Sequence, residues 1–404
     1  MIAHPVIGVV RLLLFPMFRK NTDQSFPKGI PRMTPTLVAN SAEAYSNQGN
    51  MFKEHGRLDE AIESYRLALA INPDYAEAYG DLGVVFKEQG KLDKAIANYR
   101  QALALKPDYA KAYINLGVVF HEGGILDEAA ANYRRALAIK SDYVAAHFNL
   151  GALHMSLGQT EEALLSFRRA IAYKPDLAPA AHMIAVLEGT TTQSAPHDYI
   201  KNLFNHYAKN FENHLLHKLE YTTPQVLFQR FRSLFAHDTR RIAQAIDLGC
   251  GTGLSGELFR EIADHLIGVD LSDKMLEIAS HKGVYNELHQ GDIVTFLNES
   301  RELYDLFLAT DVFVYVGELE RVFNAIKERC LPGAYFAFST EWSDGVEFVL
   351  QKSARYAHSR DYIKSLCHHF GFRIALCEAI NLRKDHDQWV LGDIFILQLI
   401  TNWQ

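Results

Sequence analysis

The stretch GCGTGLSG, residues 249–256, holds the residues whose spacing most directly indicates chemistry. Glycines without a Cβ let the backbone turn tightly and approach a ligand closely. The stretch fits two overlapping patterns: G-x-G-x-x-G when it is read from Gly251, and G-x-G-x-G when it is read from Gly249. These patterns are typical of different cofactors, so the acidic residues around the loop must decide between them.

The first pattern is typical of loops that bind nicotinamide or flavin dinucleotides, and it predicts hydride transfer. The second is the pattern of loops that hold S-adenosylmethionine, and it predicts methyl transfer. Asp270 follows the next predicted strand and suits a ribose in either cofactor, so it does not discriminate.

Asp247, two residues before Gly249, does discriminate. A carboxylate here would face the pyrophosphate of a dinucleotide in a site that attracts anions. S-adenosylmethionine has no phosphate and carries an ammonium and a sulfonium, which a nearby carboxylate favours. The sequence therefore favours the second pattern, and Gly256 is interpreted as a close-packing residue within the following helix.

The elements that must position this loop are alternating strands and helices, which predict a parallel sheet with helices on both faces. IAQAIDL is the first strand, LSGELFREIA the first helix and HLIGVD the second strand. At the end, FRIALCEAINL and DIFILQLI are separated by a charged loop and predict an antiparallel hairpin.

AIDLGCGTG, LIGVDLS, QGDI and the closing hairpin together resemble class I S-adenosylmethionine-dependent methyltransferases over about residues 198–404. With HYAKNFENHL, DVFVYVGEL and RYAHS, the arrangement is similar to predicted bacterial methyltransferases that carry tetratricopeptide (TPR) repeats and whose substrate is undefined. The resemblance implies a Rossmann-like seven-stranded sheet with S-adenosylmethionine as cofactor.

The resemblance also implies roles for individual residues. Asp247 would lie near the amino-acid end of the cofactor, Asp270 would accept the ribose hydroxyls and Asp292 the adenine amine. Thr310 would lie near the methyl group, and Tyr207 and Phe211 are candidates for a lid. The full set of cofactor-binding candidates is Asp247, Gly249, Cys250, Gly251, Gly253, Asp270, Leu271, Asp292, Ile293 and Thr310.

Methyl transfer is an in-line displacement that depends on alignment and exclusion of water, and it needs a base only when the acceptor loses a proton. The catalytic candidates are Asp311, Tyr315 and His358. Each has a plainer alternative: Asp311 binds cofactor only, Tyr315 walls the acceptor pocket, and His358 is structural. For His358 the structural role is favoured, because Ser359 is a candidate N-cap of the next helix.

Residues 42–177 repeat with a period of 34, in which small, aromatic and proline positions recur. This pattern resembles the TPR repeat, in which pairs of helices stack into a superhelix with a concave groove. Gly90 and its equivalents are expected to end the first helix of each pair, and Asp59, Asp93 and Asp127 are N-cap candidates for the second. Residues 178–189 predict one capping helix.

The groove is expected to bind a protein or peptide partner. Asn47, Asn115 and Asn149 share one repeat position, where Asp81 stands in the second unit. The repeats are similar to those of O-linked GlcNAc transferases, in which a ladder of asparagines holds a polypeptide by its backbone amides. The alternative is that these residues support the helices and that the repeats serve scaffolding or self-association.

The chain of 404 residues has 22% charged residues and a net charge of −7, which does not indicate binding to nucleic acid or an anionic membrane. The four cysteines form no C-x-x-C pair and no zinc-like spacing, so no metal site is expected, and a cytoplasmic protein with reduced thiols is expected. The apolar segment at residues 5–18 is too short for a membrane span and contains Arg11 and Pro16.

The sequence therefore predicts an all-α TPR superhelix followed by an α/β domain. The expected divisions are a basic, poorly ordered extension at 1–38, a TPR domain at 39–189, a linker at 190–198 and a methyltransferase domain at 199–404. Membrane contact of the extension is not expected, and a weak peripheral contact is the alternative. The acceptor is undefined. An alternative hypothesis is a TPR adaptor whose methyltransferase-like domain is regulatory or inactive, and a weaker one is a nicotinamide enzyme.

Overall fold

The computed structural model describes residues 41–234, 242–345, 347–385 and 388–400. The chain divides between Ala180 and Ala181 into two compact units, which are described separately below. The predicted extension at 1–38 lies outside the described residues. Within the described part of the chain, no helix is long and apolar enough to cross a membrane.

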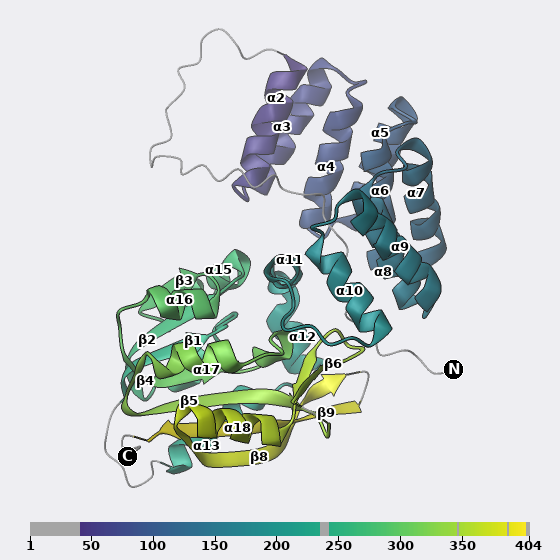
Figure 1. Cartoon of the computed structure of the whole chain (residues 1–404). Helices are drawn as coiled ribbons and strands as arrows, with labels where there is room; N and C mark the ends of the chain where they lie inside the picture. The colour runs from purple at the N-terminus through teal and green to yellow at the C-terminus, as the bar shows by residue number, and fades with distance from the viewer. Residues whose placement is uncertain (1–40, 235–241, 346, 386–387, 401–404) are drawn as a thin grey trace. The chain divides into compact units, whose positions relative to one another are not determined.

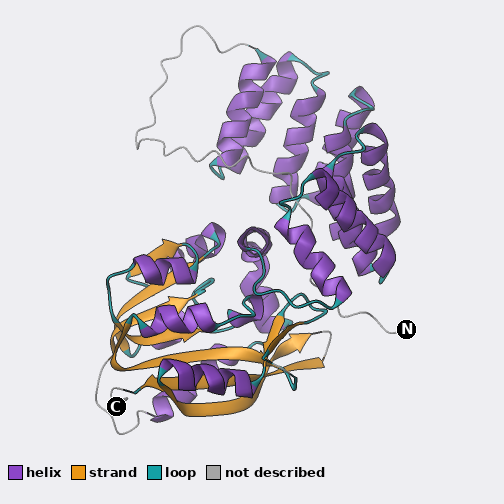
Figure 2. Ribbon diagram, in the orientation of Figure 1, coloured by secondary structure: helices purple, strands orange, loops and turns teal. Residues whose placement is uncertain are grey.

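The first unit consists of antiparallel helix pairs, as Figures 1 and 2 show. Successive pairs follow the 34-residue period of the sequence, and α10 comes after them, across the boundary between the units. The helices are α2 (Ala42–Glu54), α3 (Leu58–Ile71), α4 (Ala76–Glu88), α5 (Leu92–Leu105), α6 (Ala110–Glu122), α7 (Leu126–Ile139), α8 (Val144–Ser156), α9 (Thr160–Tyr173) and α10 (Ala178–Glu188).

One glycine and one aromatic ring set the distance between the helices of each pair. A Cβ at Gly83 in α4 would lie 2.6 Å from Cε1 of Tyr99 in α5, so only glycine lets the ring pack there. Gly90 has a φ of +76° and follows the end of α4, which confirms its predicted role in ending the helix. The N-cap prediction is wrong, because the helices begin one residue before Asp59, Asp93 and Asp127. These residues lie inside the first turn, where a carboxylate still interacts favourably with the positive end of the helix dipole.

We expect Gly83→Ala to destabilise the repeat unit by about 1–3 kcal/mol, because the new methyl group overlaps the Tyr99 ring. Thermal unfolding followed by far-ultraviolet circular dichroism would measure the loss. Gly123→Ala is the matched control, since Gly123 has an ordinary φ of −75° and only backbone carbonyl oxygens, at 3.3 and 3.5 Å, near a new Cβ. Equal stability of the two variants would contradict the packing argument.

The second unit is built on one mixed sheet. Its strands are β1 (Ile242–Leu248), β2 (Ala263–Asp270), β3 (Glu287–Gln290), β4 (Tyr304–Ala309), β5 (Cys330–Trp342), β6 (Phe348–Leu350), β7 (Tyr356–His358), β8 (Phe372–Asp385) and β9 (Gln388–Leu399). β3-β2-β1-β4-β5 run parallel in that order, β9 pairs antiparallel with β5, and β8 pairs antiparallel with β9. The predicted fold class, including the closing hairpin, is confirmed.

Helices cover both faces of this sheet, because alternate strand residues point to opposite sides. Phe307 and Phe336 belong to a core with α16 (Ile293–Glu299), α17 (Glu320–Lys327) and α18 (Arg360–Phe370). Leu306 and Ala337 belong to a second core with α13 (Thr223–Leu234) and α14 (Leu254–Phe259). The other elements are α11 (His197–Tyr207), η1 (Ala208–Asn210), α12 (Phe211–His217), α15 (Asp273–Lys282) and η2 (Phe313–Tyr315).

Two features of the sheet differ from the expectation. The hairpin β6–β7 extends the sheet beyond the expected seven strands: Glu341 at the end of β5 pairs with Ala357 of β7 as well as with Gly392 of β9. The segment after Leu382, expected to be a charged loop, continues β8 up to Asp385. It remains a strand because its pairing with β9 persists and because Arg383 finds acidic partners inside the unit.

Candidate active site

A cavity of about 240 Å³ lies in the second unit, where the carboxyl ends of the parallel strands meet. In doubly wound α/β sheets this is the edge at which ligands bind. Its wall is formed by the loops after β1, β2, β3 and β4, by α11 and α12, by the turn between β6 and β7, and by the end of β8. Elements distant in the sequence therefore contribute to one site.

The glycine loop after β1 forms one wall with a left-handed backbone. Gly249, Gly251 and Gly253 have φ of 71°, 54° and 92°. A Cβ at Gly249 would lie 2.6 Å from Cγ2 of Val312, whereas no atom lies within 4 Å of a Cβ at Gly251. Gly249, Cys250 and Gly251 line the cavity and Gly253 does not. The loop thus presents bare backbone to the cavity at Gly251.

Asp270, at the end of β2, is held in place by the glycine loop. Its Oδ2 accepts a hydrogen bond from the Gly251 N–H at 2.9 Å, and its Oδ1 accepts one from the Ser272 N–H at 2.8 Å. Burial raises the pKa of Asp270, against these hydrogen bonds, which lower it. Because each carboxylate oxygen can accept a further hydrogen bond, Asp270 can still bind donors in the cavity that it lines.

The third acid, Asp292, lines the cavity next to Ile293 and also caps α16. Its Oδ1 accepts a hydrogen bond from the Thr295 N–H at 2.8 Å, and its Oδ2 lies 3.4 Å from Nε2 of His197. Leu271 lines the cavity as well. Acidic and apolar residues that follow β2 and β3 are therefore brought together, as the sequence predicts.

Asp247 is buried and lies outside the set of residues that line the cavity. Its Oδ2 accepts a hydrogen bond from the Tyr285 hydroxyl at 2.7 Å, and its Oδ1 has no hydrogen-bond partner within the described chain. Burial raises the pKa of Asp247 from 3.8 to about 7, because the charged form loses its hydration. The same tyrosine packs on Gly256, where a Cβ would lie 2.4 Å from its ring, which supports the interpretation of Gly256 as a packing residue.

The raised pKa of Asp247 predicts a specific dependence of stability on pH. Between the unfolded pKa near 3.8 and the folded pKa near 7, the folded protein holds one proton more than the unfolded chain. The contribution of Asp247 to the free energy of unfolding therefore falls as pH rises through this range, by at most about 1.4 kcal/mol per pH unit, and is constant above it. Asp247→Asn should lack this loss.

Urea unfolding of the wild type and Asp247→Asn at pH 5, 6, 7 and 8 would measure the difference. Tryptophan fluorescence reports on the second unit alone, since Trp342, Trp389 and Trp403 all follow residue 180. Tyr285→Phe is the companion variant: it removes a hydrogen bond that lowers the pKa, so its loss of stability should extend to higher pH. Parallel pH profiles of wild type and Asp247→Asn would contradict the buried, protonated carboxyl group.

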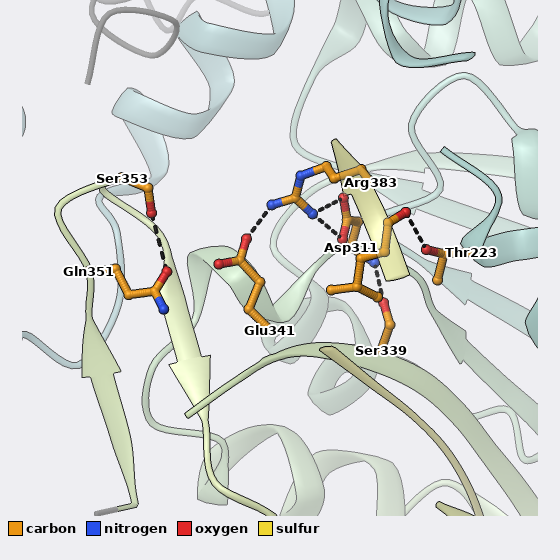
Figure 3. Close-up of polar contacts among 8 residues, drawn as sticks. Thr223, Asp311, Ser339, Glu341, Gln351, Ser353 and Arg383 are labelled. Atoms are coloured by element: carbon orange, nitrogen blue, oxygen red, sulfur yellow. Dashed lines mark hydrogen bonds and ion pairs between the residues drawn. The ribbon is translucent and has the colours of Figure 1, made fainter. Parts of the chain in front are cut away.

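The end of β4 carries Thr310 and Asp311, both of which line the cavity. The Thr310 hydroxyl lies 2.6 Å from the Ser255 hydroxyl. Asp311 has a φ of 60°, unusual for a residue with a side chain, and its N–H donates a hydrogen bond to Oγ of Ser339 at 2.9 Å. This fixed backbone orients the Asp311 carboxylate toward Arg383, as Figure 3 shows.

Arg383 is the centre of a buried ion-pair network. Its Nη1 donates to Oδ1 and Oδ2 of Asp311 at 2.9 and 2.8 Å, and its Nη2 donates to the buried Glu341 carboxylate of β5. The hydroxyl of Thr223 donates to the carbonyl oxygen of Leu382 at 3.2 Å, which fastens the same part of β8. One arginine thus joins β8, β5 and the loop after β4.

We expect Arg383→Met to lower the free energy of unfolding by about 3–5 kcal/mol, because Glu341 and Asp311 would keep their charges without a partner. Urea unfolding followed by tryptophan fluorescence would measure the loss. Adding Glu341→Gln to this variant should restore part of the stability. Arg373→Met is the matched control, since Arg373 is exposed on the same strand. Equal losses for the two single variants would overturn this account.

The other two catalytic candidates occupy different environments. Tyr315 lines the cavity and forms an edge-on contact with Phe204, with ring centroids 5.4 Å apart. His358 is buried outside the lining, and its Nε2 lies 2.9 Å from the carbonyl oxygen of Gly317. Burial lowers the pKa of His358 to about 4, so it stays neutral at ordinary pH. Ser359 caps α18, as the sequence predicts.

The cavity wall contains both predicted and unpredicted residues. The lid candidates Tyr207 and Phe211 line the cavity, together with Phe204 from the same aromatic segment. Tyr221 and Arg383 also line it and were not predicted. Little in the sequence indicates either residue, because Arg383 lies in a segment expected to be a charged loop and Tyr221 belongs to no motif.

The segment predicted to be a linker, 190–198, is hydrogen-bonded to the cavity wall. The Gly317 N–H donates to the carbonyl oxygen of Gln193 at 2.8 Å, and the Ala195 N–H donates to the carbonyl oxygen of Tyr315 at 2.9 Å. A segment without apolar periodicity can pack in this way because its backbone and its threonine hydroxyls make the contacts: the Leu350 N–H donates to Oγ1 of Thr191 at 3.2 Å.

Comparison with known families matches both units. The TPR repeat family matches residues 49–90, 83–124 and 119–158, and a second tetratricopeptide repeat description matches residues 144–177. The family described as a methyltransferase domain matches residues 246–338, which run from β1 to β5 and include the glycine loop.

Among curated proteins, the 18S rRNA (guanine-N(7))-methyltransferase RID2 of Arabidopsis thaliana is 46% identical over 48 residues, 12% of this chain and 17% of the relative. The ubiquinone biosynthesis O-methyltransferase of Bordetella avium is 26% identical over 132 residues, 30% of this chain and 55% of the relative. The chain thus spans about half or less of these relatives.

Among solved structures, MamA is 29% identical with a TM-score of 0.32, covering 34% of this chain and 80% of MamA. The magnesium protoporphyrin IX methyltransferase of Synechocystis PCC 6803 with bound SAH is 14% identical with a TM-score of 0.40, covering 50% of this chain and 99% of that chain.

Proposed function

We propose, from the premise that this chain carries TPR repeats at 49–177 followed by a methyltransferase domain, that it is an S-adenosylmethionine-dependent methyltransferase whose repeats recruit a partner. The observation that carries the proposal is the cavity lined by the bare backbone of Gly251, by Asp270, which is hydrogen-bonded to it, and by Asp292.

The residues around the cavity fit the proposed cofactor. A Cβ at Gly251 would meet open space, so this part of the loop leaves room for a ligand. Asp270 retains acceptor capacity for the two ribose hydroxyls, and Asp292 with Ile293 suits the adenine ring and its amine. Asp247 lies buried behind the loop, and its Oδ1 has no hydrogen-bond partner in the described part of the chain. A cationic ligand nearby would favour the charged form of this carboxyl group, whereas a pyrophosphate would oppose it.

S-adenosylmethionine, when bound, would supply an electrophilic methyl group. The protein's own residues would exclude water and align the acceptor, which can account for much of the acceleration in such a displacement. The aromatic residues Phe204, Tyr207 and Phe211 line the cavity and would keep water out of it. Because α11 and α12 carry these rings, we assign them the role of a lid.

We propose that Asp311 and Tyr315 position the acceptor. Asp311 has the Arg383 guanidinium against its carboxylate, so it is better suited to accept a hydrogen bond from an acceptor than to remove a proton by itself. Tyr315 would form the side of the acceptor pocket. His358, buried and bonded to a backbone carbonyl, receives no role in the chemistry.

For the repeat unit we propose binding of a polypeptide partner. Asn47 is exposed and Asn115 is half-buried, so their carboxamides can reach a peptide backbone. Asn149 is fully buried, and Asp81 at the equivalent position lies 3.1 Å from Nζ of Lys111. The proposed contacts are therefore confined to Asn47 and Asn115.

Calorimetric titration with S-adenosylmethionine and S-adenosylhomocysteine tests the enzyme proposal. The wild type should bind both, and Asp270→Ala should bind at least about tenfold more weakly, because it loses a charge-assisted hydrogen-bond acceptor. Asp361→Ala is the matched control, because the Asp361 side chain is 90% exposed on α18.

Absence of binding by the intact protein would overturn the methyltransferase proposal in favour of a TPR adaptor. Protection from thermal unfolding by NADH, and none by S-adenosylhomocysteine, would favour a nicotinamide enzyme instead. If both cofactor forms bind, methyl transfer from labelled cofactor to fractionated lysate, separated into protein and small molecules, identifies the acceptor class.

A further inference from the structure

Three arginine and lysine residues line the cavity, and only one lacks an anionic partner in the described part of the chain. Arg383 is paired with Asp311 and Glu341, and Lys384 is paired with Glu220. The third, Arg355, makes no side-chain hydrogen bond or ion pair with any described residue, although it is half-buried. A guanidinium left half-buried without a partner is costly, and a ligand carboxylate would offset that cost.

Arg355 is delivered to the cavity by a rigid turn. It belongs to the connection between β6 and β7, where Ala354 has a φ of 60° and is buried. The Ala354 N–H donates to the carbonyl oxygen of Gln351 at 2.9 Å, and the Gln351 N–H donates to the carbonyl oxygen of Arg355 at 2.8 Å. The Ser353 hydroxyl lies 3.4 Å from Oε1 of Gln351 on the same turn, as Figure 3 shows. A positive φ at a residue with a side chain is unfavourable, and such conformations are concentrated at ligand-binding sites, where the surrounding structure maintains them.

The position of this turn places Arg355 on the acceptor side of the site. β7 pairs with the carboxyl end of β5, whereas the residues proposed to hold the cofactor follow β1, β2 and β3. Tyr199 of α11 and Tyr315 line the same cavity as Arg355. In the sheet, β4 and β5 lie between β7, which follows Arg355, and β1, which precedes the glycine loop.

Part of the cavity that Arg355 lines is aromatic. Tyr199, Phe204, Phe211 and Tyr315 line the cavity, and the Phe204 ring packs edge-on against those of Tyr315 and Phe211, with centroids 5.4 and 6.0 Å apart. Rings arranged in this way favour a flat apolar ligand, which can pack against their faces and edges.

We propose that the methyl acceptor is an aromatic carboxylate, whose ring packs among these residues and whose carboxylate is bound by Arg355. This inference rests on the proposed function, because it names the substrate class of the same site. Arg355 is a specificity-determining residue here: it binds the acceptor and takes no part in moving a proton or the methyl group.

Matched acid and amide ligands test the assignment. With the full-length protein saturated with S-adenosylhomocysteine, calorimetry would measure binding of 3,4-dihydroxybenzoate and 6-hydroxy-2-naphthoate, each beside its neutral carboxamide. At least one acid should bind the wild type about tenfold or more tightly than its amide, because it alone forms a charge-assisted pair. Arg355→Gln should lose this preference, and Arg355→Lys should keep part of it.

Arg321→Gln is the matched control, since it removes an exposed arginine from α17, outside the cavity lining. It should leave the acid preference unchanged. Absence of any acid preference in the wild type, or a preference that survives in Arg355→Gln, would overturn the assignment.

The same variants show whether Arg355 binds the carboxylate of the acceptor or the carboxylate of the cofactor. Arg355→Gln should bind S-adenosylhomocysteine as tightly as the wild type does. If it binds S-adenosylhomocysteine more weakly but binds 5′-methylthioadenosine, which lacks the amino-acid end, normally, then Arg355 binds the cofactor and the assignment is wrong. Failure of the wild type to bind S-adenosylhomocysteine would overturn the proposed function itself, whereas normal cofactor binding without an acid preference overturns only the role of Arg355.

Discussion

The second unit depends on the neutralisation of one buried arginine. Arg383 is 1% exposed and lies between the carboxylates of Asp311 and Glu341, so three strands can end at the cavity without leaving an unpaired charge inside. If either acid were absent, burying the guanidinium would be costly. The network therefore fixes the length of β8, the loop after β4 and one wall of the cavity together.

Backbone strain is concentrated around the same cavity. Within the described part of the chain, the residues other than glycine with positive φ are Glu220, Asp311 and Ala354. Asp311 and Ala354 line the cavity, and Glu220 lies between Leu219 and Tyr221, which also line it. Packing elsewhere in the unit must compensate for these conformations, and in return the site is held ready before a ligand arrives.

In both units a glycine, which has no Cβ, leaves room for a tyrosine ring to pack against the backbone. Gly83 admits Tyr99 between the helices of one repeat, and Gly256 admits Tyr285 beneath the glycine loop. In the repeat the result is a regular stack suited to binding. In the second unit the same packing places the Tyr285 hydroxyl on Asp247, so a glycine that resembles part of a dinucleotide pattern serves to position an acid.

The sequence by itself determined the repeats, the alternation of strands and helices with its closing hairpin, and the acids that follow the strands, because periodicity and short motifs encode local contacts. Asp270 and Asp292 were found in this way. It could not place Arg383 or Arg355, since each acquires its meaning from residues far along the chain. Only the tertiary structure decided that Arg383 is neutralised by Asp311 and Glu341, while Arg355 has no partner among the described residues. Charge compensation depends on distances in space rather than on spacing in sequence.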